Sequence, residues 1–186
     1  GNLLDFNYGH IKSSDKLIIE KDLTIQAIKV KNFSDYKKLL KKNNIVFDHE
    51  EREKIILKKF KTICQNKKFL ESFNKKTLQD VINITENPNI LLIDFDKKYL
   101  KIPNEIIIST LEDHQRYFPL FNNKKELTNN FLVVANKSDK KNIIKEGNKK
   151  VVEARLSDAM FFWDKDKSKN LIKKIIKLKK ITFYEK

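Results

Sequence analysis

The stretch DHQRYFPLF (residues 113–121) predicts the first strand of a β-hairpin. Its aromatic residues favour an extended chain, and a polar segment, FNNKKELTNN, follows from Phe121 onward. The run FLVVA (residues 131–135) then has the high β-propensity expected of a return strand. Together the two segments predict an antiparallel hairpin with a long tip.

Alternation along this predicted strand separates its side chains into two sets. Arg116, Phe118 and Leu120 face one way, whereas Tyr117 and Phe121 face the other, so at least one aromatic set must enter a core. Packing is the favoured interpretation. The alternative is that these rings stack on unpaired RNA bases beside Arg116.

The rest of the chain predicts helices mixed with short strands. A strand pair is expected within residues 17–30, and residues 90–95 are expected to pair with a strand at 99–102 across a turn. Helices are expected over residues 35–42 with Ser34 as the cap, from Asp48 to 66, over 76–85, from Pro103, over 147–164, and after Ser168. The fold class is therefore α+β: a mixed or antiparallel sheet with β-hairpins, packed by several helices, and a helical C-terminal part.

The domain organisation is expected to be simple. Only three glycines and three prolines occur in 186 residues, so no flexible linker is predicted. We expect residues 1–186 to form a single excised α+β region of a longer chain. Residues 1–87 would supply a strand pair and a helical segment, and residues 88–186 a core of hairpin and helices.

The net charge of +15 suits a partner made of phosphates. Lysine supplies 37 of the 40 basic residues, however, so the charge equally fits compositional drift, and both interpretations stay open at this point. Where lysine is the default cation, Arg52, Arg116 and Arg155 indicate positions that need a planar guanidinium.

Several kinds of site are not supported by the sequence. A single cysteine, Cys64, excludes an internal disulfide and a cysteine-based zinc site, and its context predicts a small core residue. The three histidines are scattered, and no glycine-rich phosphate loop occurs. We therefore expect no catalytic and no metal-binding residue in this chain. Without a long apolar run, we also expect no membrane contact and a cytoplasmic location.

The segment GNKKVVEARLSDAMFFWD (residues 147–164) carries the candidate nucleic-acid contacts. It predicts a helix with a basic first turn, in which Lys149, Lys150 and Arg155 could meet RNA phosphates, together with Arg116 from the hairpin. The alternative is a core helix in which Arg155 pairs with Asp158. The aromatic residues of both segments are expected to be mostly core: Tyr117, Phe118, Phe161, Phe162 and Trp163.

These same segments resemble the beta subunit of the bacterial heterotetrameric glycyl-tRNA synthetase. The family pattern combines a Gln-basic-Tyr-Phe-Pro strand, a Leu-x-Asn-x-Phe-x-x-Val-Ala-Asn strand and a Gly-Asn-x-x-Val-Val-x-x-Arg-Leu-x-Asp-Ala-x-Phe-Phe helix. The match is good from Pro88 onward and looser before it. Glu153-Ala154 departs from the basic residue and proline that the family often has there, which weakens any phosphate contact at position 153.

The resemblance implies an internal piece from the amino-terminal half of such a subunit. It implies a partner alpha subunit that activates glycine with ATP and Mg, and a beta subunit that recognises tRNA(Gly) rather than DNA. We expect this region to contact tRNA and support the ligase without performing catalysis and without a cofactor of its own. A purely architectural module with no RNA contact is the alternative.

Overall fold

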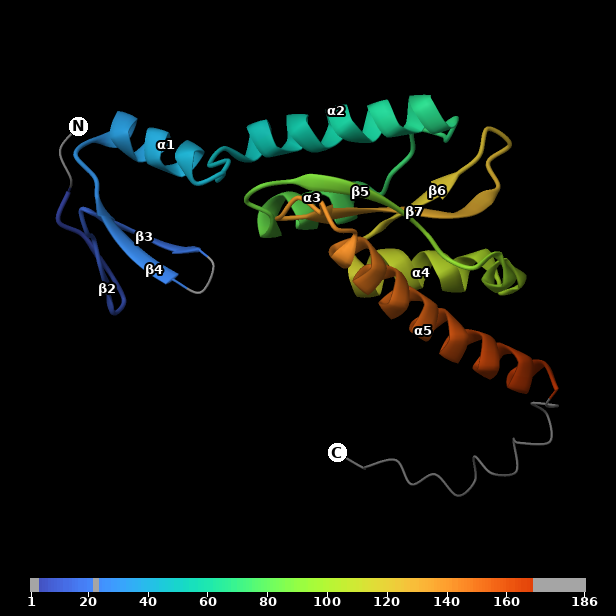
Figure 1. The fold of residues 1–186 in the computed structure, drawn as a ribbon. Helices are drawn as coiled ribbons and strands as arrows, with labels where there is room; N and C mark the ends of the chain where they lie inside the picture. Colours follow the sequence, from blue (N-terminus) through green and yellow to red (C-terminus); the bar gives the residue numbers. More distant parts are fainter. Residues whose placement is uncertain (1–3, 22–23, 169–186) are drawn as a thin grey trace, which may run out of the picture.

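The computed structural model describes residues 4–21 and 24–168 (Figure 1) and confirms the α+β class. Its strands are β1 (Asn7–Tyr8), β2 (Ile11–Lys12), β3 (Lys16–Lys21), β4 (Thr24–Lys29), β5 (Asn89–Asp94), β6 (Phe118–Phe121) and β7 (Leu127–Ala135). Its helices are α1 (Phe33–Lys42), α2 (His49–Lys67), α3 (Lys75–Ile84), the 3₁₀ helix η1 (Lys97–Lys101), α4 (Asn104–Gln115) and α5 (Ile143–Lys167).

A three-stranded antiparallel sheet of order β5-β7-β6 forms the centre of the molecule. Side chains on the central strand alternate between two cores, because successive residues of a strand point to opposite faces. Phe131 and Val133 pack in one core with η1, α4 and α5. Leu132 packs in the other with α2 and α3. Figure 1 accordingly shows α2 above the sheet, and α4 and α5 below it.

The predicted hairpin is confirmed, but its first strand is shorter than the sequence suggested. Asp113 to Gln115 belong to α4, and Arg116 ends that helix in a left-handed conformation with φ 56°. Its N–H donates to the Glu112 carbonyl at 3.0 Å, and the Tyr117 N–H donates to Leu111 at 2.8 Å, which satisfies the last carbonyls of the helix. Beyond this turn, Tyr117 and Phe118 point to opposite faces as the alternation predicted, and the structure places a core on each face.

Two other boundaries differ from the sequence-based expectation. Residues 99–102 do not form a strand: Lys97–Lys101 is the helix η1, whose start is capped by Asp96, which accepts from the Lys98 N–H at 2.9 Å. The partner of β5 is β7 instead. The cap of α1 is Asn32 rather than Ser34, since the Asn32 side chain accepts from the Asp35 N–H.

The other helices and the first strand pair agree better with prediction. Asp48 caps α2, with its carboxylate accepting from the N–H groups of Glu50 and Glu51. Cys64 on this helix is 1% exposed, and burial raises its pKa to about 11, so it is a core residue as predicted. The strand pair β3-β4 is antiparallel and lies with α1 to one side of the central sheet (Figure 1).

The basic helix predicted after Ser168 lies outside the described residues. Within residues 4–21 and 24–168, none of the helices has the length and apolar character needed to cross a membrane.

Candidate nucleic-acid interface

Helix α5 carries three of the four predicted contact residues, and it starts earlier than the sequence suggested. It begins at Ile143, where the Asp139 carboxylate accepts from the N–H groups of Ile144 and Lys145 at 3.2 and 2.7 Å. Gly147 is therefore inside the helix rather than at its entry. Lys149 and Lys150 consequently lie beyond the first turn, so the prediction of a basic first turn was wrong for these two lysines.

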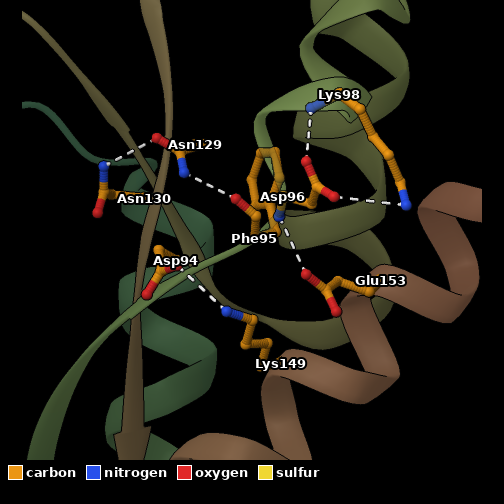
Figure 2. A network of polar contacts seen from close by, with 8 residues as sticks. All are labelled: Asp94, Phe95, Asp96, Lys98, Asn129, Asn130, Lys149 and Glu153. Carbon is orange, nitrogen blue, oxygen red and sulfur yellow. Dashed lines mark hydrogen bonds and ion pairs between the residues drawn. The ribbon is translucent and has the colours of Figure 1, made fainter.

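A polar network fastens α5 to the end of β5 (Figure 2). The Lys149 ammonium lies 3.2 Å from the Asp94 carboxylate, and the Glu153 carboxylate accepts from the Asp96 N–H at 3.0 Å. Lys149 and Glu153 are one helical turn apart, so both point at the same short segment. This segment joins β5 to η1, and the network therefore fixes the position of the whole helix.

The charges in this network stabilise one another. Hydrogen bonding from the Lys98 backbone N–H, helped by the Lys98 ammonium 3.4 Å away, holds the pKa of Asp96 below its ordinary value. The hydrogen bond to Asp94 raises the pKa of Lys149. Lys149 thus already has a carboxylate partner, and its side chain is only 30% exposed. In the structure this contact joins α5 to the end of β5.

The predicted residues separate into two groups. Arg116 resembles Lys149, since its Nε lies 3.5 Å from an Asp80 carboxylate oxygen. Lys150 and Arg155 are exposed, and neither belongs to an ion pair in the described part of the chain. The predicted pairing of Arg155 with Asp158 is therefore not found. Of the predicted contact residues, Lys150 and Arg155 are therefore left available to an external anion.

The aromatic end of α5 also differs from the prediction. Phe161 and Phe162 are not core residues: each is 60% exposed, with ring centroids 5.5 Å apart. The Lys165 ammonium lies 5.4 Å from the centre of the Phe161 ring. Only Trp163 packs against the core as expected. We call Lys150, Arg155, Phe161, Phe162 and Lys165 the outer face of α5.

The sequence contained the signal for this face. Val152 and Leu156 are fully buried, and they define the stripe of α5 that packs on the sheet. At 100° per residue, Phe161 falls on the opposite side of the helix from that stripe, and Phe162 lies about 100° from the centre of the stripe. Exposed rings beside cations can stack on unpaired bases and contact phosphates, which is how many proteins bind single-stranded nucleic acid.

Tyr117 fixes the face of α5 that lies against the hairpin. Its hydroxyl donates to the Asn148 side-chain oxygen, and Asn148 donates to the Ile144 carbonyl at 2.7 Å. Burial raises the pKa of the Tyr117 phenol, although the positive charge of Arg155 opposes this effect. The tyrosine is thus a neutral hydrogen-bond donor at neutral pH.

Replacing Tyr117 with phenylalanine removes this donor and leaves the Asn148 oxygen without a partner. We expect the free energy of unfolding to fall by about 0.5–1.5 kcal/mol, the usual net value of such a bond. Urea unfolding followed by the fluorescence of Trp163, the single tryptophan, measures it. Tyr36→Phe is the matched control, because the Tyr36 hydroxyl has no hydrogen bond among the described residues. Equal effects of the two substitutions would show that the Asn148 contact contributes nothing.

No group of three or more histidine, cysteine, aspartate or glutamate side chains in residues 4–21 and 24–168 is arranged to hold a metal ion.

Comparison of the amino-acid sequence with known proteins places this chain in a family. The family model described as glycyl-tRNA synthetase beta subunit matches residues 1–186. The chain belongs to this family. Among curated glycine–tRNA ligase beta subunits, the protein of Aquifex aeolicus is 35% identical over 186 residues, which cover 100% of this chain and 28% of that protein. The protein of Syntrophomonas wolfei is 32% identical over 184 residues, which cover 98% of this chain and 27% of that protein. The protein of Dictyoglomus thermophilum is 39% identical over 159 residues, which cover 85% of this chain and 23% of that protein.

The chain thus spans about a quarter of the length of these glycyl-tRNA synthetase beta subunits. Three asparagines of the motifs that carry the resemblance bind neighbouring segments in the structure. Asn129 donates to the Phe95 carbonyl at 2.7 Å, and Asn136 accepts from the Glu86 and Asn87 N–H groups. Asn148 accepts from Tyr117. Asn129 and Asn136 therefore bind the segments that flank β5, and Asn148 joins α5 to the hairpin.

Proposed function

We propose that this chain is a non-catalytic, tRNA-contacting and structural region of a glycyl-tRNA synthetase beta subunit, where it supports ATP-dependent attachment of glycine to tRNA(Gly). The observation that supports this most is the outer face of α5, where Lys150 and Arg155 are exposed without an ion-pair partner among the described residues, on the same helix as two exposed phenylalanine rings. The net charge of +15 favours the approach of a polyanion.

In this proposal the chemistry belongs to a partner alpha subunit, which would bind ATP and Mg and form the heterotetramer with the beta subunit in the cytoplasm. The residues of this chain bind and position. Lys149 and Glu153 attach α5 to the segment after β5, so that the helix presents Lys150 and Arg155 from a fixed base. A rigid scaffold loses less conformational entropy when it binds RNA.

Replacing Arg155 with alanine should weaken tRNA(Gly) binding by the value of one phosphate contact. The slope of log K against log salt concentration should become less steep by about one unit. Filter binding across a range of salt concentrations measures this slope. Arg116→Ala is the matched control, since its guanidinium already pairs with Asp80 and we expect it to leave the slope unchanged. If Arg155→Ala lowers the melting temperature but not the affinity, then Arg155 is a structural residue.

The alternative function, a module that assembles subunits without touching RNA, is favoured by a different observation. Large aliphatic side chains remain exposed in the amino-terminal part, among them Ile18 and Ile25 at 70% and 74%. Such side chains suit contact with protein rather than with RNA. The two functions are compatible in one region, and the salt dependence of tRNA binding decides whether RNA contact is one of them.

A further inference from the structure

The β3-β4 hairpin carries apolar side chains on both of its faces. Ile19 on the inner face is 7% exposed, and Leu17 on the same face lines a cavity with Tyr36 of α1. On the outer face, Ile18 pairs across the strands with Ala27, and Ile25 pairs with Glu20. Ile18 and Ile25 are 70% and 74% exposed, and Ala27 is exposed as well. Glu20, Lys16 and Lys29 share this side by register, and we call its apolar centre, Ile18, Ile25 and Ala27, the outer hairpin face.

This pattern is typical of a strand pair that is covered on both sides. A strand with one solvated face alternates between apolar and polar residues, whereas a strand buried on both faces has a continuous apolar run. Residues 17–19 form a short run of this kind, Leu-Ile-Ile, between Lys16 and Glu20. A two-stranded sheet is also only marginally stable by itself, because it buries little apolar surface. The hairpin is therefore suited to a second covering layer.

The chemistry of the outer hairpin face favours protein as that layer. Isoleucine and alanine side chains offer neither a ring on which a base could stack nor a donor or acceptor for a base edge. An aliphatic surface of a protein, in contrast, would remove both isoleucines from water. Full burial of one side chain of this size stabilises the covered state by about 1.5–3 kcal/mol relative to the exposed state.

We infer that the outer hairpin face is covered by an aliphatic surface of the same beta-subunit polypeptide, from the part outside residues 1–186. This inference rests on the proposed function, which makes the chain a region of a longer subunit. The matched curated relatives have nearly three quarters of their length outside the aligned part, which is ample to supply a covering layer. A covering segment on the same polypeptide is present at high effective concentration and protects the apolar face before any subunit assembles.

Photolabelling of the full beta subunit with a diazirine reagent tests this inference directly. Labelling at Ile18 and Ile25 themselves, resolved by fragmentation of the peptide because Ile19 in the same peptide is already buried, should be several-fold lower in the free native subunit than in the same subunit unfolded in urea. Labelling at the unfolded level in the free subunit overturns the inference. Protection that then appears only after the alpha subunit is added identifies the alpha subunit as the occupant. Protection that appears only with tRNA identifies RNA, and protection that appears only as the protein concentration rises identifies a second copy.

A pair of variants gives a second readout. Ile18→Lys should accelerate hydrogen exchange of residues 16–29 in the full beta subunit, whereas Ile18→Val, which keeps an apolar β-branched side chain, should not. Equal exchange in the two variants would contradict a covered face, because a lysine is tolerated at an exposed strand position. Neither measurement depends on RNA. A flat salt dependence of tRNA binding would therefore defeat the proposed RNA contact while leaving this test intact.

Discussion

Replacing Phe131 with alanine should lower the free energy of unfolding by about 3–5 kcal/mol, the range for deleting a fully buried phenylalanine side chain. Phe131 is 0% exposed on the central strand β7. Its ring lies 6.2 Å from that of Phe95 and 5.5 Å from that of Tyr117, both centroid to centroid. The cavity left behind would be surrounded by rigid rings and could not collapse easily.

Phe161→Ala is the matched control for this prediction. It makes the same chemical change at a side chain that is 60% exposed, so the loss should be within about 0.5 kcal/mol. Urea unfolding followed by Trp163 fluorescence suits both variants, because Trp163 packs on the core that contains Phe131. Comparable losses in the two variants would mean that the assignment of core and surface is wrong. Phe131→Ala should also loosen α5, since Tyr117 stacks on Phe131 and binds Asn148.

Replacing Arg52 with methionine should cost about 2–3 kcal/mol. Arg52 is 6% exposed, and its Nη1 donates to the carbonyls of Ile82 and Thr85 at 2.8 and 2.6 Å. These carbonyls lie at the end of α3, where the helix itself supplies no donor. Methionine fills similar space but leaves the two buried carbonyl oxygens without a donor, and each such loss lowers the stability by roughly 1–3 kcal/mol. Part of this loss is offset, because the substitution also removes a buried charge.

The control for Arg52 is Arg116→Met. Arg116 forms a half-exposed ion pair with Asp80, so its loss should cost less than about 1 kcal/mol. Arg52→Lys should recover only part of the stability, because an ammonium cannot reproduce the planar geometry of the guanidinium. A methionine variant as stable as the parent chain would show that the two carbonyl contacts are not needed to join α2 to α3.

Local patterns in the sequence were sufficient to predict much of the fold. The alternation around Phe118 and the β-forming run at residues 131–135 identified the central hairpin and the opposite directions of Tyr117 and Phe118, but only the structure shows that both faces are covered by a core. The helix η1 was missed because Tyr99 and Ile102 are apolar residues that suit a strand equally well. The interaction that decides in favour of the helix is the capping of the Lys98 N–H by Asp96. One capping residue before a five-residue segment is weak evidence for a helix in the sequence.

The candidate site was harder to predict, because its deciding contacts join distant parts of the chain. Lys149 and its partner Asp94 are 55 residues apart, and the tertiary structure alone shows that this lysine is engaged. Gly147 was taken as a helix boundary, yet glycine is tolerated within a long helix that packs well elsewhere. The exposure of Phe161 followed from the helical period, which places it opposite Val152 and Leu156, but the prediction gave more weight to the hydrophobicity of Phe161 and Phe162.

The salt dependence of tRNA(Gly) binding tests the central claim, that the outer face of α5 contacts RNA, most directly. The affinity should fall steeply as salt concentration rises, and the double variant Lys150→Gln/Arg155→Gln should make the slope less steep by about two units. A flat dependence in the unmodified chain, or an unchanged slope in the double variant, would contradict the claim.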